Sequence, residues 1–313
     1  MSDRTDFLRK LVDTSGVGLE IGPSYNPVFP KKIFNNVKSL DLLSKEKLKA
    51  KYAYDDKVNL DNIEDVDFVW HGETYVDLVG EDRFDWIFAS HVIEHVPDVI
   101  SFFNNISKII KENGSIVLVV PDRRYTFDAY RPQSSLSSII DTHSLQRNEP
   151  SLGMKIENNF FCCTSNEYAS RIKKFLIPRK PHGSIKNTLD YINEFEGYMD
   201  IHAWVFTPNH FRLLIESLFL ANFIEFREKY FHDTVNDEFF IVLSKNASGP
   251  GSMDMLFQKS LTEAGSDWQY KQRIITGLRV FIAALDRRFL GNSLRWAFRK
   301  IQQTMQVARL GKK

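Results

Sequence analysis

The sequence predicts an α/β fold with a doubly wound, mostly parallel β-sheet. From Val17 to Val120, short apolar segments alternate with segments of helical periodicity. Parallel strands joined by right-handed helical crossovers produce this alternation. Two later strand-like segments, 223–230 and 238–243, are separated only by a short polar joint. Such a joint is too short for a crossover, so we expect an antiparallel hairpin at the end of the sheet.

The first expected strand ends in a loop suited to a ligand. Leu19 and Ile21 supply strand-forming side chains, and Gly22 then opens a loop that contains Ser24. Ligands of open α/β sheets bind beyond the carboxyl ends of the strands, where glycine lets the backbone approach closely. Glu20 could accept hydrogen bonds from loop amides or from a cationic ligand amine. We therefore expect a ligand at this loop.

That loop does not match the usual phosphate-binding patterns. The dinucleotide fingerprint G-x-G-x-x-G requires two further glycines after Gly22, and the chain has Ser24 and Pro27 there instead. The sequence also lacks a phosphate-binding loop ending in Gly-Lys-Ser/Thr. The expected ligand is therefore one without phosphates.

The second strand, expected at 37–43, carries an acidic residue at a meaningful position. Asp41 follows Glu20 by about 20 residues, the interval at which nucleotide-binding folds place an acid on the ribose. A carboxylate can accept hydrogen bonds from both ribose hydroxyls at once. Leu42, directly after it, is a further candidate contact of the same ligand.

The next elements follow in the same order. A lysine-rich helix is expected at 44–53 and a third strand at 66–70, which runs into a turn with Gly72 and Glu73. A fourth strand begins at Phe84 and ends in a polar turn that starts with Ser90 and His91. This turn should lie at the same edge of the sheet as the loop after the first strand.

Helix signals and a buried strand complete the sheet. Asp98 can cap the following helix, which Asn113-Gly114 should end. The almost wholly apolar segment 115–120 is typical of a strand buried on both faces. Thr207-Pro208 is a favourable start for the last helix of the domain.

Composition limits the class of protein. The 313 residues are 43% hydrophobic and 26% charged, which fits one large domain with an appendage. The two cysteines, adjacent at Cys162 and Cys163, exclude a disulfide framework and a four-thiolate zinc site. Neither a signal peptide nor an apolar run of about 20 residues is present, so we expect a cytoplasmic protein.

Charge is distributed unevenly along the chain. Residues 268–313 carry eleven lysines or arginines and one acid, a net charge of +10, so the rest carries −9 of the overall +1. An acidic body argues against a nucleic-acid partner. The tail repeats an apolar and basic helical pattern, which could lie on an anionic membrane surface or pack on the body or on a second subunit. The segment Gly249–Ser252 marks a hinge, so we expect domains at 1–247 and 248–313.

In this order, the motifs resemble class I S-adenosylmethionine-dependent methyltransferases over about 15–245. Glu20-Ile-Gly22 resembles the motif that holds the methionine portion of the cofactor, Asp41 resembles the ribose-binding acid, and 84–96 resembles the fourth-strand motif of the small-molecule branch. The resemblance implies a Rossmann-like seven-stranded sheet, S-adenosyl-L-methionine as cofactor and S-adenosyl-L-homocysteine as product. The candidate cofactor-binding residues are Glu20, Gly22, Ser24, Asp41, Leu42, Gly72, Glu73, Ser90 and His91.

The sequence departs from the family pattern in two places. His71-Gly72-Glu73 stands where the family often has an acid and a small residue around adenine, so backbone groups or Glu73 would read the adenine amine. The fourth strand lacks the Asn/Asp-Pro-Pro-aromatic run of methyltransferases that act on nucleic-acid bases. This argues against a base as the acceptor.

Two later segments indicate the substrate. Residues 120–128 and 200–208 resemble a bacterial subgroup found with glycosyltransferases in surface-polysaccharide gene sets, which implies a saccharide or sugar-linked acceptor. The insertion 121–207 is where family members build the substrate pocket. Its candidate contacts to an anionic acceptor are Arg123, Arg124, Tyr125 and Arg131.

Methyl transfer to a hydroxyl needs alignment and a base. Positioning supplies much of the acceleration, and histidine is the usual base near neutral pH. The candidate catalytic residues are His91, His202 and His143, with His95 and Glu94 nearby in sequence. Asp141, His143, Asp200 and His202 could instead form a magnesium site, although we expect no resident metal. The alternative function is a catalytically silent scaffold of the same fold in a polysaccharide assembly complex.

Overall fold

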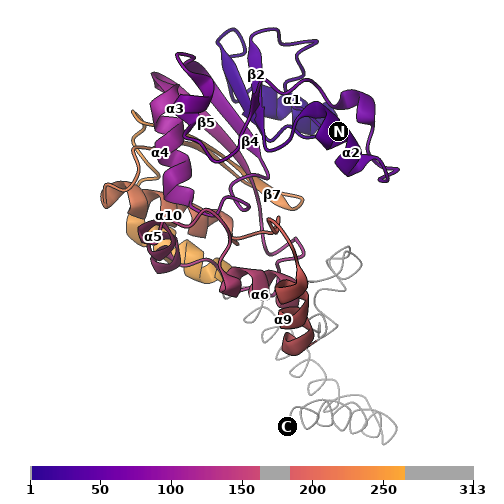
Figure 1. Cartoon of the computed structure of the whole chain (residues 1–313). Coiled ribbons are helices and arrows are strands. Elements are labelled where there is room, and N and C mark those ends of the chain that lie inside the picture. The colour runs from indigo at the N-terminus through magenta and orange to yellow at the C-terminus, as the bar shows by residue number, and fades with distance from the viewer. Residues whose placement is uncertain (1, 163–183, 265–313) are drawn as a thin grey trace, which may run out of the picture. The chain divides into compact units, whose positions relative to one another are not determined.

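The computed structural model describes residues 2–162 and 184–264 (Figure 1). The chain divides into one unit at Met1–Glu263 and a second at Ala264–Lys313. The predictions for the tail at 268–313, for Cys163 and for part of the insertion lie outside the described residues.

A seven-stranded sheet forms the centre of the first unit, in the order β3-β2-β1-β4-β5-β7-β6 (Figure 1). The strands are β1 (Gly18–Ile21), β2 (Val37–Asp41), β3 (Phe68–Val69), β4 (Phe84–Ser90), β5 (Ile110–Pro121), β6 (Arg227–Val235) and β7 (Glu238–Ser244). Among these seven strands, β7 runs in the direction opposite to the other six and pairs antiparallel with both β5 and β6. The predicted doubly wound sheet with an antiparallel last strand is confirmed.

Helices cover both faces of this sheet. Side chains of a strand alternate between the two faces, and apolar side chains on each face are buried against a helix. In β4, Ile87 packs in a core cluster with α3 (Tyr75–Val79), α4 (Val99–Ile109) and α10 (Pro208–Leu220). Its neighbours Trp86 and Phe88 instead pack in a second cluster with Leu8 of α1 (Ser2–Arg9). The short elements α2 (Lys45–Tyr52) and η1 (Leu60–Asn62) lie between β2 and β3 in the chain.

Some element bounds differ from those predicted, and one helix was not predicted. The helix capped by Asp98 ends at Ile109, ahead of Asn113-Gly114, because β5 already begins at Ile110 and pairs there with β4. The strand expected from residue 223 begins at Arg227, since the N–H of Phe223 closes the end of α10 by donating to the carbonyl of Leu218. Helix α1 was not expected, because its sequence is mostly polar.

The insertion 121–207 leaves the sheet after β5 and returns beside its own start. Asp122 and Phe206 form a parallel bridge, and the N–H of Arg123 donates to the carbonyl of Phe206 at 2.9 Å. Between them lie α5 (Leu136–Ser144), α6 (Leu152–Phe161) and α9 (Ile185–Glu194), with α6 and α9 packed together. The two ends of the insertion are therefore joined next to β5.

The chain after β7 continues to pack on the first unit. Helical residues 253–264 place Glu263 and Ser260 against α10, where Glu263 accepts hydrogen bonds from the backbone and side chain of Asn209. Ser260 lies 3.0 Å from a ring nitrogen of His210. Described residues beyond 247 thus contact α10, and the domains expected at 1–247 and 248–313 stay a prediction. None of the described helices combines the length and apolarity that crossing a bilayer requires.

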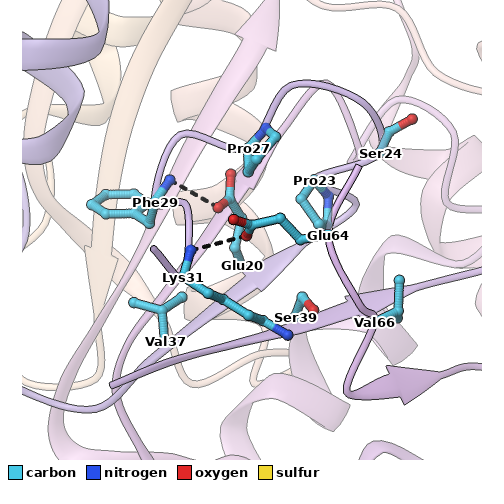
Figure 2. Close-up of a pocket in the computed structure, with 10 residues that line it drawn as sticks. All are labelled: Glu20, Pro23, Ser24, Pro27, Phe29, Lys31, Val37, Ser39, Glu64 and Val66. Atoms are coloured by element: carbon cyan, nitrogen blue, oxygen red, sulfur yellow. Dashed lines mark hydrogen bonds between the residues drawn. The ribbon is translucent and has the colours of Figure 1, made fainter. Parts of the chain in front are cut away.

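Glu20 anchors the loop after β1. Its two carboxylate oxygens accept hydrogen bonds from the backbone N–H groups of Val28 and Phe29, at 2.7 and 3.0 Å; Figure 2 shows the bond to Phe29. The side chain is only 4% exposed, and burial raises the pKa of Glu20 to about 7 although both hydrogen bonds lower it. Glu20 thus fixes the return of the loop over β1.

The pKa of Glu20 predicts a specific pH dependence of stability. Between its ordinary value of 4.5 and about 7, the folded state holds a proton that the unfolded state has released. Its contribution to the free energy of unfolding is therefore complete below about pH 4.5 and falls as the pH rises to about 7, by at most about 1.4 kcal/mol per pH unit. The variant Glu20→Gln cannot titrate, so urea unfolding across this range should show it gaining stability relative to wild type as the pH rises. A difference that does not change with pH would contradict this, and the exposed Glu81→Gln is the control.

Candidate functional site

The carboxyl ends of β1, β2 and β4 meet at one edge of the sheet, and Gly22 occupies the first of them. Its φ is +66°, a left-handed conformation that side chains other than glycine rarely adopt. A Cβ atom at this position would lie 2.9 Å from Cγ2 of Val92. The backbone N–H of Gly22 donates to the carbonyl of Leu40 at 2.7 Å. Glycine is therefore required by both the turn and the space beside the fourth-strand motif.

Asp41 lies at the end of β2, directly beside the loop that Gly22 opens. Its carboxylate accepts hydrogen bonds from the N–H groups of Leu42 at 2.7 Å and Ser24 at 3.1 Å. Burial raises the pKa of Asp41 above its ordinary value, although the backbone hydrogen bonds oppose that shift. A carboxylate can accept about four hydrogen bonds, so capacity remains for a ribose hydroxyl. Leu42 is 48% exposed, which leaves an apolar side chain available at the same edge.

The turn after β3 lies next to Asp41, because the N–H of Trp70 donates to the Asp41 carbonyl at 2.9 Å. Gly72 has a φ of +109°, and the Trp70 indole N–H donates to the carbonyl of Glu73 at 2.7 Å. The Glu73 carboxylate accepts from the N–H of His71 at 2.8 Å. The turn is thus organised by its own hydrogen bonds beside Asp41, and a cofactor role for Gly72 and Glu73 stays a prediction.

At the end of β4, His91 also adopts a left-handed conformation, with a φ of 54°. Its Nε2 lies 2.9 Å from Oε2 of Glu238, and Arg4 of α1 binds the same carboxylate and reaches the Ser90 hydroxyl at 3.4 Å. Burial lowers the pKa of His91, but the hydrogen bond with Glu238 and the charges of Glu94 and Glu238 outweigh it and raise the pKa. Arg4 and Glu238 were not predicted from the sequence.

His91, Glu94, His95 and His202 come together beyond β4, and we call this group the histidine cluster. Glu94 is 0% exposed, and its Oε1 lies 3.5 Å from Nδ1 of His91 and 4.0 Å from Nε2 of His95. The rings of His95 and His202 meet edge to face, with centroids 4.7 Å apart. Nδ1 of His95 lies 2.9 Å from Asp200; burial lowers the pKa of His95, but Asp200 and Glu94 raise it overall.

Asp128 positions His202 within this cluster. Its Oδ2 lies 2.6 Å from Nδ1 of His202, and its Oδ1 accepts from Arg131 at 2.9 Å. Arg131 also donates to the carbonyl of His202 at 2.7 Å. Burial opposes the charge of Asp128, but its bonds to His202 and Arg131 keep the pKa below its ordinary value. Because Nδ1 is engaged, Nε2 is the His202 nitrogen available for chemistry.

The four residues expected to clamp an anionic acceptor have different positions. Arg131 is 1% exposed and supports Asp128 and His202 from inside the protein. Arg124 binds the buried carboxylate of Asp122, and its guanidinium lies 5.4 Å from the ring centroid of Tyr125. Arg123 donates to the carbonyl of Arg131 at 3.0 Å. These arginines therefore hold the loop after β5 in shape.

The remaining candidate base and metal ligands do not join the cluster as expected. His143 of α5 lies 2.9 Å from Oδ2 of Asp98, the residue that caps α4 by accepting from the N–H of Ser101. Asp141 is exposed on the same helix. The expected set of Asp141, His143, Asp200 and His202 is thus divided, with Asp200 and His202 beside His95 and with His143 in a helix cap.

A small pocket lies under the loop after β1 (Figure 2). Glu20, Ser24 and Glu64 line it, together with Lys31, whose N–H donates to Glu64 at 2.9 Å. The enclosed space holds about one water molecule, which is far too little for a nucleoside. Neither Asp41 nor the histidine cluster lines it. This pocket is therefore too small for the ligand expected at the sheet edge.

Comparisons with known proteins identify the family of this chain. The chain matches the family model described as "Methyltransferase domain" over residues 1–184. No curated protein matches it in sequence. The matched range contains the loop after β1, the acid of β2 and most of the histidine cluster.

Several solved structures are similar at low identity. The CcbJ methyltransferase from Streptomyces caelestis is 16% identical, over 39% of this chain and 50% of that chain, with a TM-score of 0.28, so the match spans only half of CcbJ. The DhpI–SAH complex is 11% identical over 80% of this chain and 85% of that chain, with a TM-score of 0.38. An S-adenosylmethionine-dependent methyltransferase from Clostridium acetobutylicum is 12% identical over 77% of this chain and 89% of that chain, with a TM-score of 0.39.

Identities and TM-scores this low carry no argument about function, so the assignment rests on the domain match. Because the matched residues make up more than half of the 313 residues, the chain belongs to the methyltransferase domain family.

Proposed function

We propose that the protein transfers a methyl group to a hydroxyl oxygen of a saccharide or sugar-linked acceptor in surface-glycan biosynthesis. The observation that carries this proposal is the contact between Asp128 and His202. It joins the two segments, 120–128 and 200–208, whose sequences resemble the polysaccharide-associated subgroup. It also places an imidazole beside the end of β4, where the fourth-strand motif lies. A hydroxyl acceptor requires such a group, because its proton must leave during methyl transfer.

The residues at the sheet edge fit the cofactor. When bound, S-adenosyl-L-methionine supplies an electrophilic methyl group on a sulfonium sulfur. Asp41 would accept hydrogen bonds from the ribose hydroxyls, and Gly22 would allow the backbone to approach the methionine portion. Leu42 would cover the adenine ring, with Gly72 and Glu73 beside it. Ser90 and His91 would border the methionine side, and Glu20 and Ser24 would hold the loop.

Among the candidate bases, we assign activation of the acceptor to His202. Asp128 fixes the ring orientation and stabilises positive charge on it, as an acid does for a catalytic imidazole. Nε2 of His91 is hydrogen-bonded to Glu238 and its Nδ1 lies 3.5 Å from the buried carboxylate of Glu94, so both nitrogens of His91 face carboxylates. His143 takes part in capping α4. His202 is therefore the imidazole whose Nε2 can meet the acceptor.

The Asp41→Asn variant should bind S-adenosyl-L-homocysteine about 10 to 100 times more weakly than wild type. The reason is the loss of hydrogen bonds from the ribose to a charged acceptor, worth about 1.5–3 kcal/mol. Calorimetric titration of the product measures this without any methyl acceptor. Asp56→Asn, at an exposed aspartate after α2, is the matched control. An unchanged affinity of Asp41→Asn would remove Asp41 from the cofactor site.

The Asp128→Asn variant should lower kcat by about 10- to 100-fold and leave KM for the acceptor and the affinity for S-adenosyl-L-homocysteine nearly unchanged. An asparagine can present its amide N–H to Nδ1, which favours the wrong tautomer of His202 while keeping the shape of the site. His202→Gln should lose at least 100-fold in kcat. His232→Gln, on β6, is the control. A loss of cofactor affinity in either variant would instead place the pair in the cofactor pocket.

A further inference from the structure

Glu94 is a buried acidic residue of the histidine cluster, and its carboxylate has no hydrogen-bond partner. Both of its carboxylate oxygens are buried without a hydrogen-bond donor, although the residue is completely inaccessible to solvent. Burying a carboxylate without such partners is costly, so native structures rarely leave one in this state. The nearest imidazole nitrogens, at 3.5 Å on His91 and 4.0 Å on His95, attract its charge but do not form hydrogen bonds with it.

The surrounding cations do not balance this charge. Arg4 binds Glu238, Arg131 binds Asp128, and Lys51 lies 3.6 Å from Asp200. Each of these positive side chains is matched to a different acid. Within the described residues, Glu94 forms no ion pair with a lysine or an arginine. The site therefore has excess negative charge at Glu94 whenever its histidines are neutral.

Three side chains present ligand atoms to one another at this point. One ligand atom each from Glu94, His95 and His202 lies within 4.8 Å of the other two. Bond lengths of about 2.0–2.2 Å to a metal ion place its ligand atoms about 3.4 Å apart in a tetrahedral site. Small side-chain rotations would therefore close these three groups around an ion.

The two histidines are already oriented as metal ligands usually are. Asp128 engages Nδ1 of His202 at 2.6 Å, so Nε2 is the nitrogen of that ring left for a ligand bond. Asp200 lies 2.9 Å from Nδ1 of His95, at the distance of an ion pair but without the geometry of a hydrogen bond. Nε2 of His95 is the nitrogen that faces Glu94, at 4.0 Å. Carboxylates on the outer nitrogen fix the tautomer and raise the basicity of a metal-binding imidazole.

We propose that Glu94, His95 and His202 form a binding site for one divalent first-row transition-metal ion. Two imidazole nitrogens and one carboxylate suit ions such as Zn²⁺, Mn²⁺ or Co²⁺, whereas Mg²⁺ and Ca²⁺ prefer oxygen ligands. Three protein ligands leave a coordination position open. With the ion bound, Nε2 of His202 is a ligand and no longer acts as the base. The ion would then hold the acceptor hydroxyl at the open position and promote release of its proton to solvent, a role that rests on the proposed function.

The test uses the full-length protein stripped with a chelator and titrated with Co²⁺. Calorimetry and the visible absorption of Co²⁺ should both report one ion per chain, and the ion should raise the melting temperature. Glu94→Gln and His202→Gln should each weaken binding at least tenfold and abolish the thermal shift. Asp128→Asn should weaken Co²⁺ binding about tenfold, since this substitution removes only the carboxylate that holds Nδ1 of His202 and leaves the three metal ligands in place. His143→Gln, at a histidine also paired with an aspartate, should bind as wild type does.

Wild-type protein that binds no Co²⁺ at millimolar concentration would overturn the proposal. Equal binding by wild type, Glu94→Gln and His202→Gln would overturn it as well, because the ion would then lie elsewhere. If circular dichroism shows that Glu94→Gln does not fold, His95→Gln is used in its place and should also weaken Co²⁺ binding at least tenfold. A different result would contradict the proposed function alone. Metal-loaded protein that binds S-adenosyl-L-homocysteine but methylates no saccharide would overturn the saccharide acceptor and support the metal site.

Discussion

The carboxylate of Asp128 connects the parts of this site. It receives Arg131 on one oxygen and His202 on the other, and so joins the start and the end of a long insertion. Removing one partner from a buried ionic network leaves an uncompensated charge, typically at a cost of about 3–5 kcal/mol. The position of His202 beside β4 therefore depends on a contact made inside the protein.

The succession of strands along the chain and the antiparallel direction of the last strand could be predicted from the sequence because the pattern is local. Apolar runs such as 115–120 identify buried strands, and the short polar joint before β7 requires a hairpin. Gly22 and Asp41 were identifiable for the same reason, since spacing along the chain decides which strand end they occupy. Element ends were less predictable: α4 stops before its glycine because a strand partner is already available at Ile110.

Contacts between distant residues could not be predicted in this way. His202 meets Asp128 across 74 positions, and His91 meets Glu238 across 147. Nothing local to Arg131 distinguishes an arginine that faces a substrate from one that supports a buried acid. Only pairing in three dimensions shows that its guanidinium is enclosed. Arg4 was missed likewise, because its partner Glu238 begins a strand at the far end of the chain.

The sheet edge thus contains two kinds of residue. The side that we propose for the cofactor consists of backbone turns and one acid on strand ends, which a parallel sheet positions regardless of the rest of the chain. The side that we propose for the acceptor consists of imidazoles and carboxylates, to which the insertion contributes His202. This division accounts for how a common fold can serve many acceptors, since the insertion can change while the strand ends remain.

One titration tests most directly whether the sheet edge at the carboxyl ends of β1, β2 and β4 binds S-adenosyl-L-methionine. Calorimetry of the full-length protein with S-adenosyl-L-methionine and with S-adenosyl-L-homocysteine should give one site per chain with a dissociation constant in the micromolar range. Absence of binding to both compounds, with the protein folded, would contradict the account of the site given by Gly22, Asp41 and the histidine cluster.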